Sequence, residues 1–333
     1  MIVRGFDLIG STLNVEAEEQ ALVDAFAVLM RGMDVEPARN PAFTLSVRRG
    51  APAPIPASAV LVYEGPVFWE GDCTYVSDGD RLHLLFPDRV SLVVDPHRKA
   101  AEIVVAENDV ARAGATAGVL ALDAAIDESG QFMLHAAGLT LPGRDEQVLV
   151  FAPSGTGKST TSLALADRGF GLCADDTMVI RLEDGRATGW GLPRDLKVHR
   201  NTAAMMPWLH QYLGDKWNDE DEQALTRAAL SDRVRIEKAE RRPIAGIFML
   251  ERGETAGSRA DPMSQTDTLV SLAADNVRTG RAGLLASHRR RFACLAGLAS
   301  TVPTYRLTVG SEPRSAASAI VEALGRAKAA SGP

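Results

Sequence analysis

One short stretch constrains this chain more than any other, the run Ala152-Pro153-Ser154-Gly155-Thr156-Gly157-Lys158-Ser159, which we call the glycine loop. The apolar run 147–151 leads into the glycine loop, and residues 160–168 follow it with helical spacing. A strand, a glycine-containing loop and a helix in this order are the context in which such a motif holds phosphate. The sequence therefore predicts an α/β fold with a phosphate site where the strand ends.

The residue types of the glycine loop suit a nucleotide phosphate. Glycines let the backbone curl so that consecutive N–H groups point inward, and the start of the helix adds unpaired N–H donors. We expect the phosphates to be bound by Ser154, Gly155, Thr156, Gly157, Lys158, Ser159 and Thr160. Within this set, Lys158 can reach the outer phosphates and the Ser159 hydroxyl can bind Mg²⁺. The usual motif begins with glycine where this chain has Ala152, and a glycine-rich turn that binds nothing is the alternative.

Composition narrows the class of protein. The chain has 333 residues, 46% of them hydrophobic and 24% charged, which is ordinary for a globular protein with one large and one smaller domain. A net charge of −7 gives no reason to expect nucleic acid or an anionic membrane as partner. The start of the chain lacks a leader pattern, and no apolar run is long enough to span a bilayer. We therefore expect a cytoplasmic protein, and the sequence leaves open whether it forms a homo-oligomer.

Patterning divides the chain into two parts. Residues 1–110 predict a mixed, β-rich α/β lobe, with a strand over 6–15, a helix over 17–33 and antiparallel hairpins over 60–105. Residues 111–333 contain the glycine loop and predict a second domain. There a strand over 132–141 is joined by a short turn to the strand before the glycine loop, so the two should be antiparallel neighbours. Residues 202–240, 266–285, 289–299 and 315–330 are predicted to be helical, and 244–250 and 305–309 to be strands.

Two adjacent carboxylates follow the apolar run that comes after the glycine-loop helix. Asp175 and Asp176 could divide two tasks, one holding Mg²⁺ and the other accepting the proton of an incoming hydroxyl. A solvated turn at the start of a strand is the alternative. Arg194 and Lys197 could contact phosphate or an anionic substrate, although plain surface charge is the favoured interpretation of both. His135, taken alone, is a single histidine in an apolar segment and predicts an interior residue.

Four segments resemble the catalytic domain of bacterial HPr kinase/phosphorylase, namely 133–137, 154–159, 165–170 and 174–176. That family shows a strand with histidine, a Gly-x-Ser-Gly-x-Gly-Lys-Ser loop, a helix ending in Arg-Gly-His and a Val-Ala-Asp-Asp strand. The match looks closest to divergent HPr-kinase-related proteins, some of which phosphorylate the precursors of lasso peptides. It spans residues 110–310 in outline and is specific over 132–180.

The resemblance implies a core like that of phosphoenolpyruvate carboxykinase, with ATP and Mg²⁺ as cofactors. The family's loop lysine and serine fall on Lys158 and Ser159, its catalytic aspartate on Asp176 and its active-site histidine on His135. The chain departs from the family at Thr160, where the family has an acidic residue. The family's Leu-Glu-x-Arg-Gly segment, which supplies a further metal-site glutamate, has no counterpart, and residues 193–197 stand in that region.

These observations favour an ATP-dependent kinase that phosphorylates a hydroxyl, on a peptide, a protein or a small molecule. Catalysis would rest on Asp176, His135 and Lys158, and the metal on Ser159 and Asp175. A nucleotide-binding switch or scaffold without transfer activity is the second hypothesis, and a simple ATPase the third. Phosphoryl transfer to an acceptor, or phosphate release without one, separates the three.

Overall fold

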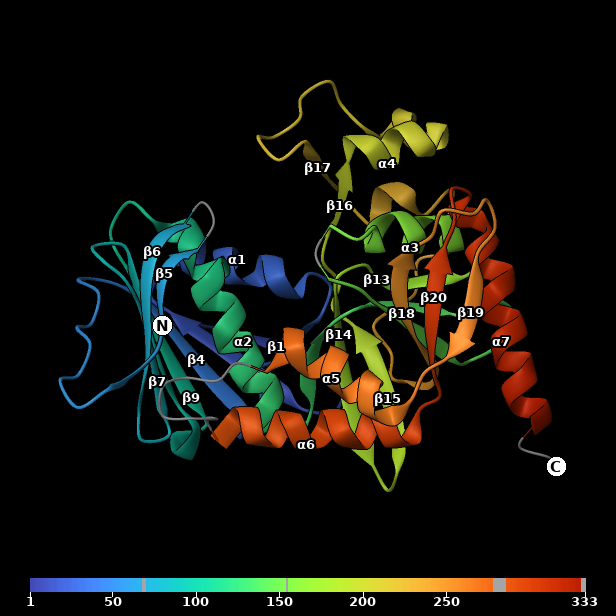
Figure 1. Ribbon diagram of the computed structural model, residues 1–333. Helices are drawn as coiled ribbons and strands as arrows, with labels where there is room; N and C mark the ends of the chain where they lie inside the picture. Colours follow the sequence, from blue (N-terminus) through green and yellow to red (C-terminus); the bar gives the residue numbers. More distant parts are fainter. Residues whose placement is uncertain (68–69, 154, 278–285, 331–333) are drawn as a thin grey trace. The chain divides into compact units, whose positions relative to one another are not determined.

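The computed structural model describes residues 1–67, 70–153, 155–277 and 286–330. They form two compact units, Met1–Met133 with Val277–Ala293, and Leu134–Asn276 with Cys294–Pro333. Both units combine sheet and helix, so the predicted α/β class is confirmed (Figure 1). The first unit runs beyond residue 110, where the sequence placed the end of the N-terminal lobe. The extent of a catalytic domain over 111–333 stays a prediction.

A nine-stranded sheet in the order β3-β1-β2-β4-β9-β8-β7-β6-β5 is the centre of the first unit. The strands are β1 (Ile2–Asp7), β2 (Thr12–Ala17), β3 (Asp34–Val35), β4 (Phe43–Arg49), β5 (Val60–Val67), β6 (Gly71–Asp78), β7 (Arg81–Phe86), β8 (Val90–Asp95) and β9 (Ala100–Val105). Strands β5 to β9 pair consecutively and antiparallel, which confirms the predicted hairpins. The single strand expected over 6–15 is wrong. Positive φ angles of 55° at Ile9 and 104° at Gly10 turn the chain there into the β1–β2 hairpin.

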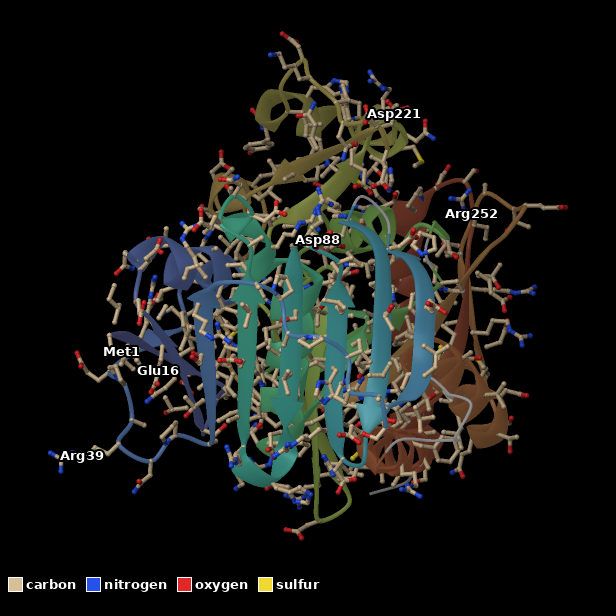
Figure 2. All side chains as sticks on the ribbon, turned by 90° about the vertical axis from the view of Figure 1, so that its left-hand side faces the viewer. Met1, Glu16, Arg39, Asp88, Asp221 and Arg252 are labelled. Carbon is tan, nitrogen blue, oxygen red and sulfur yellow. The ribbon has the colours of Figure 1, made fainter. Side chains whose placement is uncertain are left out.

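Two helices cover one face of this sheet, α1 (Gln20–Ala27) and α2 (Thr116–Glu128) (Figure 1). Helix α1 buries Leu22, Val23 and Phe26, which lie on one face of the helix at the spacing of an amphipathic helix. Figure 2 shows the strands of this sheet from the side away from the two helices. Over the ranges that the structure describes, no helix is both long and apolar enough to cross a membrane.

The second unit is built on a sheet in the order β10-β14-β15-β18-β12-β11-β13, with β20 beside β18 and β19 beside β20. Its strands are β10 (Phe132–His135), β11 (Ala137–Thr140), β12 (Gln147–Phe151), β13 (Gly171–Ala174), β14 (Thr177–Glu183), β15 (Arg186–Gly191), β18 (Arg242–Arg252), β19 (Arg259–Pro262) and β20 (Thr304–Val309). Its helices are α3 (Lys158–Ala166), α5 (Gln265–Asn276), α7 (Ala316–Ala330) and the end of α6 (Ala286–Thr301). The predicted helix over 266–285 matches α5 as far as Asn276, and its part over 278–285 lies outside the described residues.

Strand direction brings several chain segments to one edge of this sheet, which we call the loop edge. Strand β11 is antiparallel to both β12 and β13, as predicted for β12, so β12 and β13 run the same way. Strand β18 is parallel to β12. The carboxyl ends of β12, β13 and β18 and the amino end of β11 therefore lie together. The glycine loop after β12, Asp175 and Asp176 after β13, and His135 before β11 thus converge.

The opposite end of the same sheet, which we call the far edge, holds a paired charge cluster. The Arg242 side chain, 10% exposed, lies 3.1 Å from Asp145, 2.8 Å from Glu240 and 3.3 Å from Glu237. Glu237 also accepts a hydrogen bond of 2.7 Å from the Thr140 hydroxyl and lies 2.8 Å from the Arg235 Nε. Each charge of the cluster thus faces an opposite charge or a donor.

The long helix expected over 202–240 is wrong. The chain instead forms β16 (Leu196–His199), α4 (Arg200–Met205), two 3₁₀ segments (Pro207–Tyr212 and Ala228–Leu230) and β17 (Glu222–Leu225). Pro207 has no backbone N–H and ends α4 after a turn and a half. Strands β16 and β17 pair into a two-stranded sheet, which Figure 1 shows beside α4.

Candidate functional site

The glycine loop has the backbone that its glycines predicted. Gly155 and Gly157 have φ angles of 77° and 112°, in the left-handed region that favours glycine. Gly157 is the residue before the first turn of α3, which begins at Lys158. Among the described residues other than glycine, positive φ occurs only at Ile9, Asp88, Lys99, Asp184 and Asp221, so buried Ala152 fits without strain. Ser154 lies outside the described residues.

Arg252, at the end of β18, holds the outer side of the glycine loop. Its Nε donates to the carbonyl oxygen of Thr156 and its Nη2 to that of Gly155, each at 3.0 Å. Because a trans peptide places C=O and N–H on opposite sides, the N–H of Gly157 points away from Arg252. Sequence reasoning missed Arg252 because the contact joins positions almost 100 residues apart.

Lys158 and Asp176 are brought together at the loop edge. The Lys158 side chain is 9% exposed, and its Nζ lies 3.4 Å from Asp176 Oδ1. Thr160, predicted to bind phosphate, has its hydroxyl 2.7 Å from the hydroxyl of Thr202 in α4. Two side chains of the glycine loop therefore contact the carboxylate pair: Lys158 lies beside Asp176, and Ser159 lies beside Asp175.

Asp175 lies beside Ser159. Burial raises the pKa of Asp175 to about 6, against the effect of a hydrogen bond from the Ser159 hydroxyl, and the charge of Asp176 adds to the rise. Its Oδ1 is shielded from solvent and has no hydrogen-bond partner in the described part of the chain. A hydroxyl beside a buried carboxylate oxygen with a free lone pair suits Mg²⁺, which takes few protein ligands and keeps water or phosphate oxygens as the others. The described residues contain no cluster of three or more His, Cys, Asp or Glu arranged to hold a metal.

Asp176 is the centre of a hydrogen-bonded group. Its Oδ1 lies 2.9 Å from His135 Nε2, and its Oδ2 accepts a bond of 3.1 Å from the Thr177 hydroxyl. Loss of surrounding water raises the pKa of Asp176, but the hydrogen bond from His135 and the charge of Lys158 outweigh that loss and hold the pKa well below its usual range. The Asp176 side chain keeps 56% of its surface open, so a bound molecule can reach it.

His135 is tied into this group from its other side by α5. Its Nδ1 lies 2.9 Å from Asp275 Oδ2, and its backbone N–H donates to Asn276 Oδ1 at 3.2 Å. The hydrogen bond to Asp176 raises the pKa of His135, and Asp275 adds to this against the effects of burial and Lys158. Asp275 carries no sequence signal, because it is separated from His135 by 140 residues.

Arg194 and Lys197, both predicted to contact substrate, differ in their surroundings. The turn after β15 lies beside the start of β14, with the Leu192 N–H donating to the Thr177 carbonyl at 3.1 Å. Arg194 therefore lies close to Asp176, while burial lowers the pKa of its guanidinium. Lys197 is exposed on β16 and pairs with Glu222 of β17 at 3.5 Å.

No protein-family model matches the chain, and no curated protein does. The description of the site therefore rests on the positions and contacts of its own residues. It comprises a curled loop at a helix start, a lysine paired with an open carboxylate, a second carboxylate beside a serine hydroxyl, and a histidine held between two carboxylates.

Proposed function

We propose that this chain is an ATP- and Mg²⁺-dependent kinase of the HPr-kinase-related type. It transfers the γ-phosphoryl group to a hydroxyl group, on a serine or threonine of a peptide or protein or on a small molecule. One observation carries the proposal: Lys158, Asp176 and the Asp175–Ser159 pair converge at the loop edge. The resemblance over 132–180 supports the same activity, with a core like that of phosphoenolpyruvate carboxykinase.

The residues present fit the two cofactors. Ser159 and Asp175 would hold Mg²⁺, which supplies charge neutralisation and orientation of the phosphate oxygens. Lys158 and the N–H groups at the start of α3 bind the phosphates, as positive charge and helix-end donors do in other proteins. Arg252 keeps the glycine loop in its curled form through the Gly155 and Thr156 carbonyls.

Asp176 acts as the base. In the free protein Lys158 and His135 keep this carboxylate ionised, which is the form that accepts a proton. When Lys158 turns toward phosphate oxygens, Asp176 loses one of the charges that stabilise its ionised form, so its proton affinity rises. Asp176 then takes the hydroxyl proton as the acceptor oxygen bonds to the γ-phosphorus and the bond to the ADP oxygen breaks. His135, fixed by Asp275, keeps the carboxylate in place.

A nucleotide-binding switch, or an ATPase that uses water as acceptor, is the second candidate. Two observations favour it: the low pKa of Asp176 in the free protein, and the absence, among the described residues, of a group of three or more His, Cys, Asp or Glu that could hold a metal. A base is of no use to a protein that only binds nucleotide, and Asp176 is open to solvent. We therefore place the kinase first.

The test is a transfer assay with ATP labelled in its γ-phosphate and a panel of hydroxyl acceptors, including peptides encoded beside this gene. We expect label on one acceptor, at a hydroxyl located by product mass. Nucleotide binding with no label on any acceptor would favour the switch. Label found only in free phosphate, at a rate that acceptors leave unchanged, would favour the ATPase.

A further inference from the structure

The guanidinium of Arg194 is shielded from solvent, and two of its three nitrogen atoms have no hydrogen-bond partner among the described residues. Its Nε and Nη2 are both covered, and neither has a hydrogen-bond partner within residues 1–67, 70–153, 155–277 and 286–330. Burial lowers the pKa of the group, with Asp176 acting against that. A shielded donor without a partner costs free energy, so a native protein keeps one where something else compensates.

The two unpaired atoms lie on the same edge of the guanidinium plane. This is the edge from which arginine donates two parallel hydrogen bonds to a carboxylate or a phosphate. A single unpaired nitrogen would suggest a packing defect. Two on one edge make a complete receptor for two oxygen atoms of one anion.

Asp176 is the carboxylate whose charge acts on Arg194, and its oxygens are already engaged by other groups. Oδ1 lies 2.9 Å from His135 and 3.4 Å from Lys158, and Oδ2 accepts from the Thr177 hydroxyl. Arg194 therefore feels the charge of Asp176 without a hydrogen bond to it. Lys158 and His135 also lie beside Asp176, so the Asp176 carboxylate is shared among several positively charged or donor groups and leaves the Arg194 edge without a hydrogen bond.

We propose that the Nε–Nη2 edge of Arg194 is the subsite for the phosphoryl group in transit, beside the Asp176 carboxylate that deprotonates the acceptor. The proposal rests on the proposed kinase function. The phosphoryl group has two sources, the γ-phosphate still on ATP or the phosphate already on the product, and both present the same oxygens. Because the edge is shielded in the free protein, entry of the anion requires a neighbouring group to move.

The matched control is Arg227, a second buried arginine of the same unit. Its two terminal nitrogens donate to the carbonyl oxygens of Leu172, Cys173 and Glu237, all inside the fold. Burial lowers its pKa as it does that of Arg194. The two arginines thus differ in partners and not in burial, and replacing each by methionine separates a structural role from a receptor role.

The first measurement is the melting temperature of the ligand-free protein. Arg194→Met should melt at or above the wild-type temperature, since a buried charge without partners is removed, and Arg227→Met should melt below it. If Arg194→Met melts as low as Arg227→Met, Arg194 is structural and the proposal is overturned. Arg194→Lys, which keeps the charge and loses the fork, guards against an effect of methionine itself.

The second measurement is binding by calorimetry of three probes: ADP, the β,γ-imido analogue of ATP, and inorganic phosphate added to the ADP complex. If the edge binds the γ-phosphoryl group, Arg194→Met lowers the affinity for the ATP analogue about tenfold and leaves the affinity for ADP unchanged. If the edge binds the product phosphate, Arg194→Met binds both nucleotides as the wild type does, and it no longer binds inorganic phosphate in the ADP complex. Unchanged binding of all three probes overturns the proposal. None of these readings needs catalysis, so they stand apart from a failure to find an acceptor.

Discussion

The far edge and the loop edge of the second unit's sheet differ in how completely their charged side chains are paired. At the far edge Arg242 faces Asp145, Glu237 and Glu240, and Glu237 is further engaged by Thr140 and Arg235. At the loop edge the shielded atoms of Arg194 and Asp175 Oδ1 have no hydrogen-bond partner among the described residues. The charged side chains at the far edge are thus paired, although the buried Gln147 Oε1 beside Arg242 has no hydrogen-bond partner among the described residues, whereas at the loop edge charged groups themselves are left without one.

This difference in pairing indicates which end of the sheet carries the functional site. Unpaired buried polar atoms are destabilising, so a cluster of them on charged groups points to a ligand or water that completes them, whereas paired charges serve the fold. The far edge should therefore control stability with little effect on phosphoryl transfer. The loop edge should control transfer with little loss of stability, or with a gain.

The largest effect is expected for Lys158→Ala. Removing the charge at the start of α3 should lower the rate of phosphoryl transfer about 100- to 1000-fold, because the γ-phosphoryl oxygens lose a preorganised cation. The measurement is single-turnover transfer at saturating ATP. Lys216→Ala, at an exposed lysine outside the site, is the control and should keep the wild-type rate.

Arg242→Met should act on stability instead. It leaves the largely buried Glu237 without one of its positive partners, and we expect the free energy of unfolding to fall by about 3 kcal/mol. Denaturation in urea measures this, and the transfer rate of the folded variant should stay unchanged. Arg306→Met, which breaks an exposed pair with Glu251, should cost less than about 0.5 kcal/mol. Equal costs for the two variants would contradict the division between the edges.

Asp275→Asn tests the support of His135. The variant keeps the shape of the side chain and removes the charge that helps to raise the pKa of His135. We expect the pKa of His135 to fall toward its ordinary value and transfer to slow about tenfold, as when a positioning carboxylate is lost. Histidine resonances followed by NMR against pH report the pKa. An unchanged pKa with a slower rate would assign Asp275 a different role.

The smallest effect, and the one with a distinctive sign, concerns the adjacent carboxyls. The pKa of Asp175 is raised from 3.8 to about 6, so its contribution to stability falls as pH rises through that window. Asp175→Asn removes the penalty and should melt above the wild type at pH 7, with the difference vanishing toward pH 4. Asp176 has a lowered pKa, which gives stability that is present above pH 3.8 and lost in acid. Asp176→Asn should therefore melt below the wild type at pH 7. The same sign for both variants would refute the assigned environments.

Much of this arrangement is readable in the sequence, for local reasons. The glycine loop, its flanking strand and helix, and the hairpin before them follow from short-range spacing, and the direction of β11 and β13 then places Asp175 and Asp176 beside the loop. The roles of Asp275 and Arg252 could not be predicted from local spacing, because each residue reaches the site from a distant segment through tertiary packing. The charged stretch 202–240 was misread as helix because Pro207 and the β16–β17 pairing override its composition.

The central claim is that Asp176 directs the phosphoryl group to a hydroxyl acceptor. The most direct measurement is the partition of labelled γ-phosphate between acceptor and water, in the wild type and in Asp176→Asn. We predict that the wild type labels its acceptor and that Asp176→Asn lowers this labelling about 100- to 1000-fold, with nucleotide binding retained. A variant that labels the acceptor at the wild-type rate, or a wild type that releases all label to water, would contradict the account.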